Sequence, residues 1–501
     1  MAALLLGIAF CITAPANAQD RTARGKTVIG IRGSMFTING ELTYTPAAGF
    51  PNADPNVIGT LLNVRAVQAV FDDANYPRQG SREHPYPTEV MGPVFWDYPD
   101  GKWDPERNTR EFIEALPEWR KSGVLAFTVN FQGGGPTDGN YGRVGTQREL
   151  VQPHENSGFD AEGNLKPAYA ARMERIIAAA DRLGMVTLVG FFYFGQNERI
   201  QVRPDGRYIK QAVANGMKFL KALPQRNVLV EINNEISPGY KHPQLQPDGV
   251  YELVNLARSI GGREIPISMS YVGNLPTPGS RAFQSLSAVD YILIHTNSRL
   301  PEEVHTAIQS WRRLAGYDRP LMINEDGFST FNLHAAVEEH SGWGYYDQGW
   351  SNYRDGFQSP PTNWHISTPL KWLFFEQVAR LTGSPIPARP QYESDDLPRI
   401  KVIGLSPNQV VKEPTSVEVV VEDRHPRWPV QRVEFYIDGK PETYTEKAPY
   451  FLGGRELWNP SSLAPGKHTV RVVAIDRRGP RFTQTASIVE IPIVVEKQEQ
   501  Q

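Results

Sequence analysis

The sequence predicts an α/β protein, a (β/α)₈ TIM barrel followed by a small all-β immunoglobulin-like sandwich. Apolar strand-like runs alternate with amphipathic helix-like stretches between residues 27 and 385. This alternation predicts parallel pairing through crossover connections, and about eight such units match a closed barrel. Beyond a proline-rich segment, short alternating strands separated by glycine-containing turns are typical of a sandwich.

The barrel region is predicted to open with a hairpin, because residues 27–44 alternate around Asn39-Gly40, a two-residue turn signal. Eight strands follow, at 64–72, 124–131, 185–193, 228–232, 265–271, 291–295, 320–324 and 342–346. Helices are expected at 168–183, 251–260, 302–314 and 370–381. The alternative is an open doubly wound sheet. That fold predicts a phosphate-binding turn, but QGGGP at 132–136 lacks the GxGxxG spacing and reads as a loop.

Four prolines between residues 385 and 398 predict a linker at 386–397, which separates a catalytic barrel (27–385) from the sandwich (398–496). In the sandwich, Val433, Phe435 and Ile437 alternate with polar residues, as in a half-buried antiparallel sheet.

The first 18 residues have the character of a cleaved export signal. They are apolar and end in Ala16-Asn17-Ala18, an A-x-A cleavage site, although a basic start is missing. We expect cleavage after Ala18 and a secreted or periplasmic protein; a buried N-terminal helix is the alternative. Cys11, the one cysteine of the sequence, would leave with the signal, so no disulfide or thiolate–metal site is expected.

Composition excludes several classes of partner. The 501 residues are 40% hydrophobic and 21% charged, with a formal net charge of −3, which argues against nucleic acid or an anionic membrane as the main partner. Past the signal, no run of 18 or more apolar residues occurs, so no membrane span is expected. These numbers leave the oligomeric state open.

Two glutamates stand where a barrel places catalytic groups, at the carboxyl ends of its strands. Glu235 follows the apolar run 228–232, and Glu325 follows PLMIN at 320–324. Three strand–helix units of about 30 residues separate them, so their side chains should face each other across the pocket. Two facing carboxylates can cleave a glycosidic bond, one protonating the leaving oxygen while the other attacks or activates water.

This pattern resembles that of clan A retaining glycoside hydrolases, the cellulase-like barrels, over roughly residues 27–385. The resemblance implies that Glu235 is the general acid/base and Glu325 the nucleophile, with carboxyls about 5–5.5 Å apart. It implies that Asn234 binds the 2-hydroxyl of the sugar being cleaved. Since close like charges raise one pKa, Glu235 is expected to hold a proton while Glu325 stays ionised. Residues 433–479 resemble the Ig-like modules of bacterial exported glycosidases.

Further candidates flank this pair. His295 ends the sixth predicted strand, but Asn297 stands where relatives carry a tyrosine that orients the nucleophile; Tyr271, Tyr193 or Tyr345 are the alternatives. Asn130 ends the second strand and is a candidate substrate contact. Aromatic faces stack on sugars, and Tyr193 and Trp343 are the expected contacts of this kind.

No cofactor is expected. The ten histidines show no HExxH-like spacing, so no metal site is predicted, and no G-x-S-x-G elbow supports an esterase. The leading hypothesis is an exported retaining O-glycosyl hydrolase acting on a poly- or oligosaccharide. A barrel that binds glycan without cleaving it and a transglycosylase on the same fold are the alternatives.

Overall fold

The computed structural model describes residues 25–73, 97–134, 143–144, 147–148, 155–236, 240–272, 275–349, 353–392, 397–422, 430–454, 456–477 and 484–496. The predicted export signal, residues 1–18, lies outside these ranges. Among the helices within them, none combines the length and apolar character that a membrane crossing requires.

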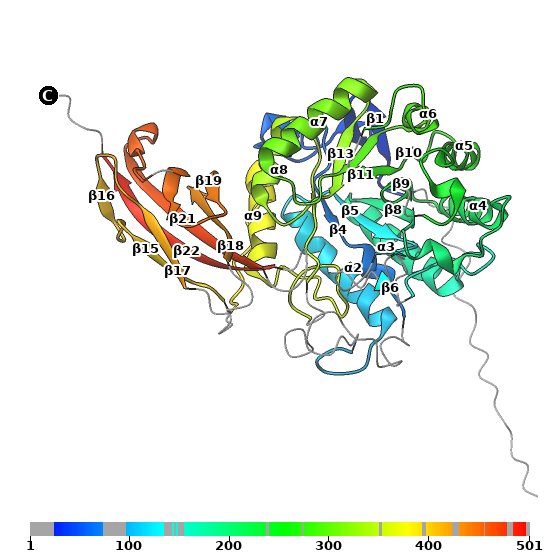
Figure 1. Cartoon of the computed structure of the whole chain (residues 1–501), viewed down its shortest axis with the longest axis horizontal. Coiled ribbons are helices and arrows are strands. Elements are labelled where there is room, and N and C mark those ends of the chain that lie inside the picture. The colour runs from blue at the N-terminus through cyan, green and yellow to red at the C-terminus, as the bar shows by residue number, and fades with distance from the viewer. Residues whose placement is uncertain are drawn as a thin grey trace, which may run out of the picture.

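Eight parallel strands close into a barrel, which confirms the predicted fold class (Figure 1). They are β4 (Asn63–Arg65), β5 (Ala126–Asn130), β8 (Val186–Phe192), β9 (Val228–Asn233), β10 (Ile267–Ser268) continued by β11 (Ser270–Val272), β12 (Ile292–His295), β13 (Leu321–Glu325) and β14 (Gly344–Tyr345). Each strand pairs with the next in the sequence order, a bridge between Met322 and Gly342 joins β13 to the last strand, and β14 pairs with β4 to close the ring.

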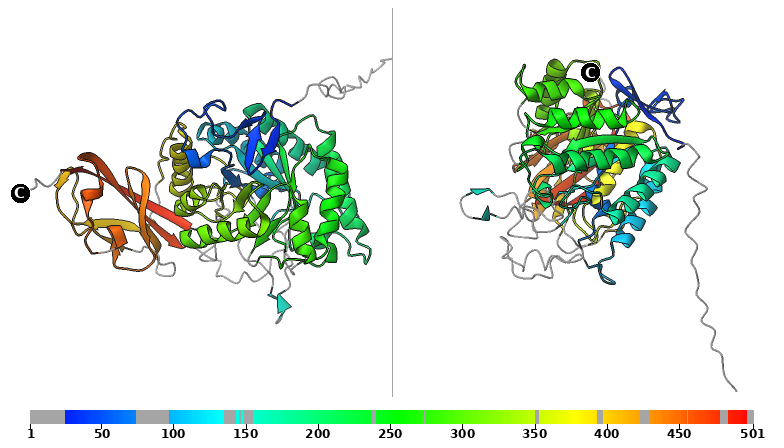
Figure 2. Two further views of the ribbon diagram at one scale, coloured as in Figure 1. Left: turned by 90° about the horizontal axis from the view of Figure 1, so that it is seen from above. Right: turned by 90° about the vertical axis from the view of Figure 1, so that its right-hand side faces the viewer.

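Helices surround this barrel (Figures 1 and 2), and the described ranges contain eight of them. They are α2 (Pro105–Lys121), α3 (Pro167–Leu183), α4 (Arg207–Ala222), α5 (Val250–Gly261), α6 (Arg281–Ala288), α7 (Pro301–Ala315), α8 (Thr330–Glu338) and α9 (Pro369–Thr382). Local sequence sets their ends: Asp104 caps α2 before a proline, and Gly184 ends α3 in the left-handed conformation that glycine adopts without cost. Because helices cover the outside, every residue of β9 is buried, which explains its apolar run.

The N-terminal hairpin covers the amino-terminal end of the barrel. It consists of β1 (Ile29–Arg32), β2 (Met35–Ile38) and β3 (Glu41–Leu42), and the predicted turn at Asn39-Gly40 is confirmed, with both residues at positive φ. The backbone N–H of Ile29 donates to the carbonyl of Arg226, just before β9. The opposite end of the barrel is therefore the one left for a site.

The remaining short elements lie in connections. They are β6 (Arg143–Val144), β7 (Gln147–Arg148), η2 (Pro55–Val57), η3 (Val67–Val70), η4 (Asn197–Arg199), η5 (Pro243–Leu245), η6 (Leu452–Gly454) and η7 (Pro460–Ser462). The predicted first strand, 64–72, is shorter than expected, because its second half forms η3.

Two sheets form the C-terminal sandwich, as predicted. One contains β15 (Arg399–Ile403), β17 (Glu418–Glu422) and β20 (Tyr450–Phe451), and the other β16 (Gln409–Val411), β22 (Gln484–Val495), β21 (Gly466–Arg477), β18 (Val430–Ile437) and β19 (Lys440–Thr445). Phe435 and Val433 enter the sandwich core, yet Glu434 and Tyr436 on the other face of β18 are also fully buried. The expected half-buried sheet is wrong for this strand, because its second face packs on the barrel.

The sandwich lies beside α8 and α9 in both views (Figures 1 and 2). Tyr436, Val473, Ile475 and Ala486 of the sandwich belong to the same apolar core as the barrel. The segment between α9 and β15 is bound to both parts, since the carbonyl of Pro387 accepts from the Trp372 indole and Arg389 donates to the carbonyl of Ile488. We propose that the divisions at 385/386 and 397/398 mark the limits of barrel, linker and sandwich.

Candidate active site

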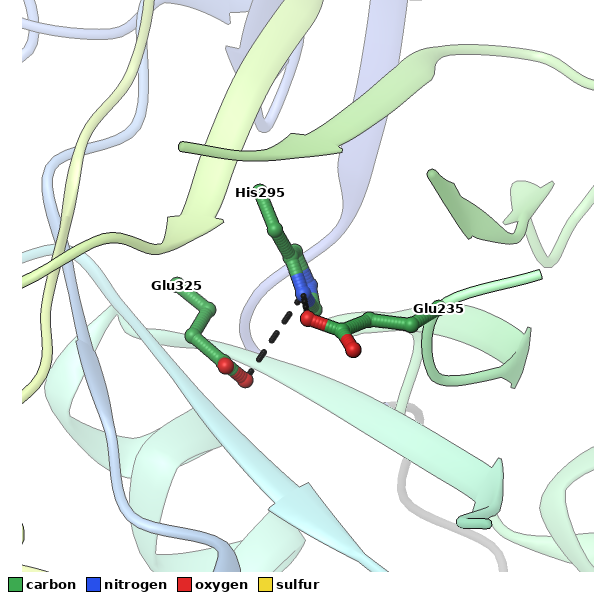
Figure 3. A group of neighbouring side chains, drawn as sticks. All are labelled: Glu235, His295 and Glu325. Carbon is green, nitrogen blue, oxygen red and sulfur yellow. Dashed lines mark hydrogen bonds and ion pairs between the residues drawn. The ribbon is translucent and has the colours of Figure 1, made fainter. Parts of the chain in front are cut away.

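The two predicted glutamates meet at the carboxyl end of the barrel. Glu235 lies two positions after the end of β9 and Glu325 ends β13, and Figure 3 shows their carboxylates on either side of the His295 imidazole. Nδ1 of His295 lies 3.0 Å from Oε1 of Glu235 and 3.7 Å from Oε2 of Glu325. One carboxylate oxygen of each glutamate and a ring nitrogen of His295 all lie within 4.8 Å of one another. The expected convergence of the two carboxylates is therefore present.

Arg65 is a site residue that the sequence analysis missed. It lies on β4 with 1% of its surface exposed, and its Nε is 2.6 Å from Oε2 of Glu325. Its Nη2 donates to Oδ1 of Asn234 over 2.6 Å. An arginine inside the apolar run of the first predicted strand was the available signal, because a buried guanidinium needs a charged partner.

Asn234 is buried next to both glutamates and keeps part of its amide available. Its Oδ1 is occupied by Arg65, whereas Nδ2 has no hydrogen-bond partner within the described ranges. A buried amide donor without a partner is costly, so this N–H₂ group is suited to a ligand hydroxyl.

Asn297 contacts the acid/base candidate rather than the nucleophile candidate. Its Nδ2 donates to Oε1 of Glu235 over 3.1 Å, beside His295. On the other side of the ring, Nε2 of His295 lies 3.9 Å from Oε1 of Glu231. The imidazole thus stands among three carboxylates, those of Glu231, Glu235 and Glu325.

Glu235 has a left-handed backbone, with φ at 51°, which is uncommon for a non-glycine residue. Its N–H donates to Oγ of Ser270 over 2.7 Å, and the N–H of Ile236 donates to the carbonyl of Ser270. Strained residues of this kind persist only where their surroundings hold them, and they concentrate at functional sites.

Asp326 organises the loops behind the site. Its carboxylate accepts from the backbone N–H of Ser298 over 2.9 Å and from the Asn332 amide and Trp343 indole, each over 2.8 Å. The expectation that Trp343 stacks on a sugar is corrected by this contact. The Trp343 side chain is fully buried and packs against Phe374, so no face of the indole is open.

The three tyrosines considered for orienting the nucleophile make different contacts. Tyr271 donates to the carbonyl of Ala282, and Tyr345 donates to Asp347, so neither hydroxyl orients Glu325. Tyr193 follows β8, and its ring stacks on that of Phe194, with the ring centres 4.3 Å apart.

Asn130 lies deeper in the barrel than the two glutamates. It shares a row of the sheet with Gly190 and Glu231, and its amide has no hydrogen-bond partner among the described residues. The structure therefore does not bring Asn130 into contact with Glu235 or Glu325.

Burial and neighbouring charges set the ionisation of the site. Burial raises the pKa of Glu325, and the opposing effects of Arg65 and His295 do not cancel this. Burial acts on Glu235 as well, but hydrogen bonds from His295 and Asn297 bring its pKa below the ordinary value. Burial lowers the pKa of His295, and the charge of Glu325 and the Glu235 hydrogen bond more than offset it, so the pKa is raised. The order of the pKa values of the two glutamates is therefore opposite to the expected one.

Glu235, His295 and Glu325 are also close enough together to offer three ligands to a metal ion. The Arg65 guanidinium lies 2.6 Å from Oε2 of Glu325, so a cation bound through that oxygen would face a second positive charge. The set is better suited to proton transfer and charge stabilisation than to metal binding.

Comparison with known proteins identifies the C-terminal part. Residues 398–472 match the family described as "Bacterial Ig domain". No curated protein matches the chain in sequence.

Several solved structures are similar to the chain at low identity. An endo-β-1,4-mannanase from Thermotoga petrophila is 13% identical over 78% of this chain and 95% of its own, with a TM-score of 0.38. A tri-modular GH5 subfamily 4 endo-β-1,4-glucanase from Bacillus licheniformis is 12% identical over 90% of this chain and 80% of its own, with a TM-score of 0.39. A β-glucuronidase from Parabacteroides merdae is 10% identical over 95% of this chain and 51% of its own, with a TM-score of 0.38, so the chain spans about half of its length. The strand pairing described above makes residues 63–345 a (β/α)₈ barrel, and residues 398–472 match a bacterial Ig domain.

Proposed function

We propose that the protein is a retaining glycoside hydrolase that cleaves O-glycosidic bonds of a poly- or oligosaccharide. The observation that carries this proposal is the pair Glu235 and Glu325, with carboxylate oxygens within 4.8 Å across the mouth of the barrel. Retaining enzymes place their two carboxyls about 5–5.5 Å apart, whereas inverting enzymes leave about 6.5–9.5 Å for a water molecule. The short separation supports direct attack by one carboxylate.

In the first step, a carboxylate oxygen of Glu325 attacks the anomeric carbon, and the bond to the leaving oxygen breaks. Glu235 gives its proton to that oxygen, so the product is a glycosyl ester on Glu325 and a free alcohol. In the second step Glu235 removes a proton from water, the water oxygen attacks the same carbon, and Glu325 leaves as a carboxylate. Two inversions give net retention.

The surrounding residues support these roles. The anomeric carbon gains positive charge beside Glu325, which favours the ionised form of Glu325 and leaves Glu235 as the group that carries the proton. Arg65 stabilises the carboxylate of Glu325 when it leaves. The free Nδ2 of Asn234 is placed to donate to a sugar hydroxyl near the reacting carbon.

The test is turnover on a glycan panel that includes β-1,4-mannan, β-1,4-glucan and an aryl β-glucuronide, with Glu325→Ala as the blank. We expect Glu325→Gln and Glu235→Gln to lower kcat by several orders of magnitude, and NMR of the first product to show the anomeric configuration of the substrate. The same activity in the blank, or an inverted product, would contradict the proposal.

The alternatives give different results in the same assay. A barrel that only binds glycan shows unchanged affinity in both glutamine variants and no turnover in the wild type. A transglycosylase forms new oligosaccharides when an acceptor sugar is added.

We also propose export with cleavage after Ala18, supported by the A-x-A sequence at 16–18. N-terminal sequencing of the secreted protein should begin at Gln19, and retention of residues 1–18 would contradict it.

A further inference from the structure

Buried polar side chains of β18 hold the start of α8. The Ser329 hydroxyl donates to Oε1 of Glu434 over 3.0 Å, and Nη1 of Arg432 donates to the same hydroxyl over 2.8 Å. The hydroxyls of Thr330 and Tyr436 are 2.7 Å apart, and Tyr436 donates to Oε2 of Glu434 over 2.6 Å. All five side chains are at most 5% exposed. Both oxygens of the Glu434 carboxylate are therefore engaged with this helix start, directly or through Tyr436.

The sandwich replaces a cap that α8 does not make for itself. Ser329 occupies the N-cap position, but its side chain accepts no hydrogen bond from the helix, and the first turn contains no acidic residue. The carboxylate of Glu434 stands at this end instead, where negative charge is favoured by the helix dipole. The position of α8 thus depends on a residue more than 100 positions away.

The same helix start is joined to the active site. Ser329 lies four positions after Glu325, the proposed nucleophile. Between them, Asp326 accepts from the Asn332 amide over 2.8 Å and from the backbone N–H of Ser298 over 2.9 Å. Residues 325–332 therefore form one hydrogen-bonded unit, with the nucleophile at one end and the sandwich at the other.

A second set of contacts joins the sandwich to α9, and none of its hydrogen bonds goes to Ser329, Thr330 or Tyr436. Arg471 donates from both Nη atoms to the Glu376 carboxylate, over 3.0 and 3.1 Å, and both side chains are buried. Buried ion pairs of this kind fix orientation more than they add net stability. They provide a control, because Arg471→Lys weakens the contact with α9 but removes no hydrogen bond of Ser329, Thr330 or Tyr436. The Arg471 guanidinium also lies 5.8 Å from the centre of the Tyr436 ring, and lysine keeps the positive charge there.

We propose that the bacterial Ig domain helps to position the catalytic site. In this proposal Glu434 and Tyr436 are positioning residues: they fix the conformation of residues 325–332 and thereby the position of the Glu325 carboxylate. The expected effect on kcat rests on the proposed hydrolase function. The effect of the domain contacts on the conformation of residues 325–332 does not. A domain that served only as a spacer or as a separate glycan-binding module would leave this segment unchanged when its contacts are lost.

The experiment compares full-length Tyr436→Phe, which loses a single hydroxyl, with full-length Arg471→Lys. Hydrogen exchange of amides 326–333 is measured without any glycan, and kcat and KM are measured on whichever panel polysaccharide the wild type cleaves fastest. Tyr436→Phe should speed exchange about fivefold or more and lower kcat roughly three- to thirtyfold, with KM within about twofold. Arg471→Lys should lower the unfolding temperature but leave both quantities within about twofold of the wild type.

Two further variants link the effect to one hydrogen bond. Thr330→Ser should keep wild-type kcat, and the pair Thr330→Val with Tyr436→Phe should lose no more than Tyr436→Phe alone, since that change already removes the contact with Thr330. The coupling between the domain contacts and residues 325–332 would be overturned if hydrogen exchange of amides 326–333 were unchanged in Tyr436→Phe. It would also be overturned if Arg471→Lys changed exchange and kcat as much as Tyr436→Phe does. Faster exchange with wild-type kcat would overturn its catalytic role. A wild type without turnover refutes the hydrolase proposal, and the exchange data then decide the coupling alone.

Discussion

Ser270 holds the backbone of Glu235 in its left-handed conformation through a single hydroxyl. We predict that Ser270→Ala lowers kcat about tenfold or more, because the buried N–H of Glu235 loses its acceptor and the carboxylate is misplaced. Ser268→Ala is the matched control: Ser268 lies two positions earlier, is equally buried, and donates to the carbonyl of Tyr291 instead. Steady-state kinetics at a temperature where both variants are folded checks this, and equal loss in both would contradict it.

Asn297 influences the pKa of the Glu235 carboxyl. Its amide donates to Glu235 and lowers the pKa of that carboxyl, so removing the amide should raise it. Since the first step needs protonated Glu235, we predict that Asn297→Gly moves the alkaline limb of kcat/KM to higher pH by up to about one unit. Glycine preserves the backbone, because φ at position 297 is 49°.

Ser298→Gly provides the comparison for this profile. Ser298 is also left-handed, with φ at 59°, and its side chain donates to the carbonyl of Asp326 rather than to Glu235. The alkaline limb of kcat/KM in Ser298→Gly should therefore lie at the same pH as in the wild type. A limb that does not move in Asn297→Gly would show that the amide does not tune Glu235.

The residues of the site differ in how well the sequence revealed them. Glu235, Glu325, Asn234 and His295 stand at strand ends, where a polar residue after an apolar run indicates a position at the mouth of the barrel. Arg65 and Asn297 could be paired with the glutamates only after barrel closure, because their partners lie far away along the chain. Trp343 was misjudged because an aromatic residue near a strand end has the same local pattern whether it faces a cavity or the core.

At the scale of elements, the connection between β14 and α9 carries buried Asp347, and α9 itself carries buried Lys371. Burial and the charge of Asp355 raise the pKa of Asp347 to about 7, and burial lowers the pKa of Lys371 to about 7. The Lys371 ammonium donates to the carbonyls of Arg354 and Asn363, which hold this connection against α9.

The sign of the pH dependence follows from these values. In the unfolded chain Asp347 releases its proton near pH 3.9, whereas in the folded chain it keeps it to about pH 7. The folded state binds more protons between these limits, so this group makes stability fall as pH rises from about 4 to about 7. Lys371 acts in reverse above pH 7, where the unfolded state binds more protons.

We predict that the free energy of unfolding falls less between pH 4 and pH 7 in Asp347→Asn than in the wild type. The difference in that fall should be on the order of 2 kcal/mol. Urea unfolding at a series of pH values measures this. Glu442→Gln is a suitable comparison, because Glu442 also has a raised pKa but lies in the sandwich, on β19. A pH slope in Asp347→Asn equal to that of the wild type would show that Asp347 does not titrate as described.

The elements themselves followed the sequence closely where their pattern was long. Seven of the predicted barrel strands lie within about two residues of the observed ones at either end, because runs buried on both faces are continuous and end in turns. In the sandwich, β15, β16, β19 and β20 were not predicted. They are short or carry many polar residues, and pairing with neighbours rather than their own pattern makes them strands.

At the scale of the whole molecule, one face of the sandwich belongs to the apolar core of the barrel, and a buried ion pair also joins the two parts. We predict that the full chain unfolds in a single calorimetric transition, and that Glu376→Gln lowers its midpoint, because a broken buried pair leaves the Arg471 charge uncompensated at a cost of about 3–5 kcal/mol. Glu490→Gln should change it far less, since Glu490 also pairs with Arg471 but its side chain is 39% exposed. Two separate transitions in the wild type would contradict this prediction.

The sequence by itself determined the barrel, the sandwich and the strand ends that carry Glu235 and Glu325, because strand and helix periodicities and polar strand tips are local properties of the chain. Tertiary structure alone decided that Arg65 lies against Glu325, that Trp343 donates to Asp326, and that Glu434 accepts from Ser329 at the start of α8. Each of these contacts joins residues that have no shared local pattern. Their energies depend on burial and on partners that only the closed barrel and its docked sandwich bring together.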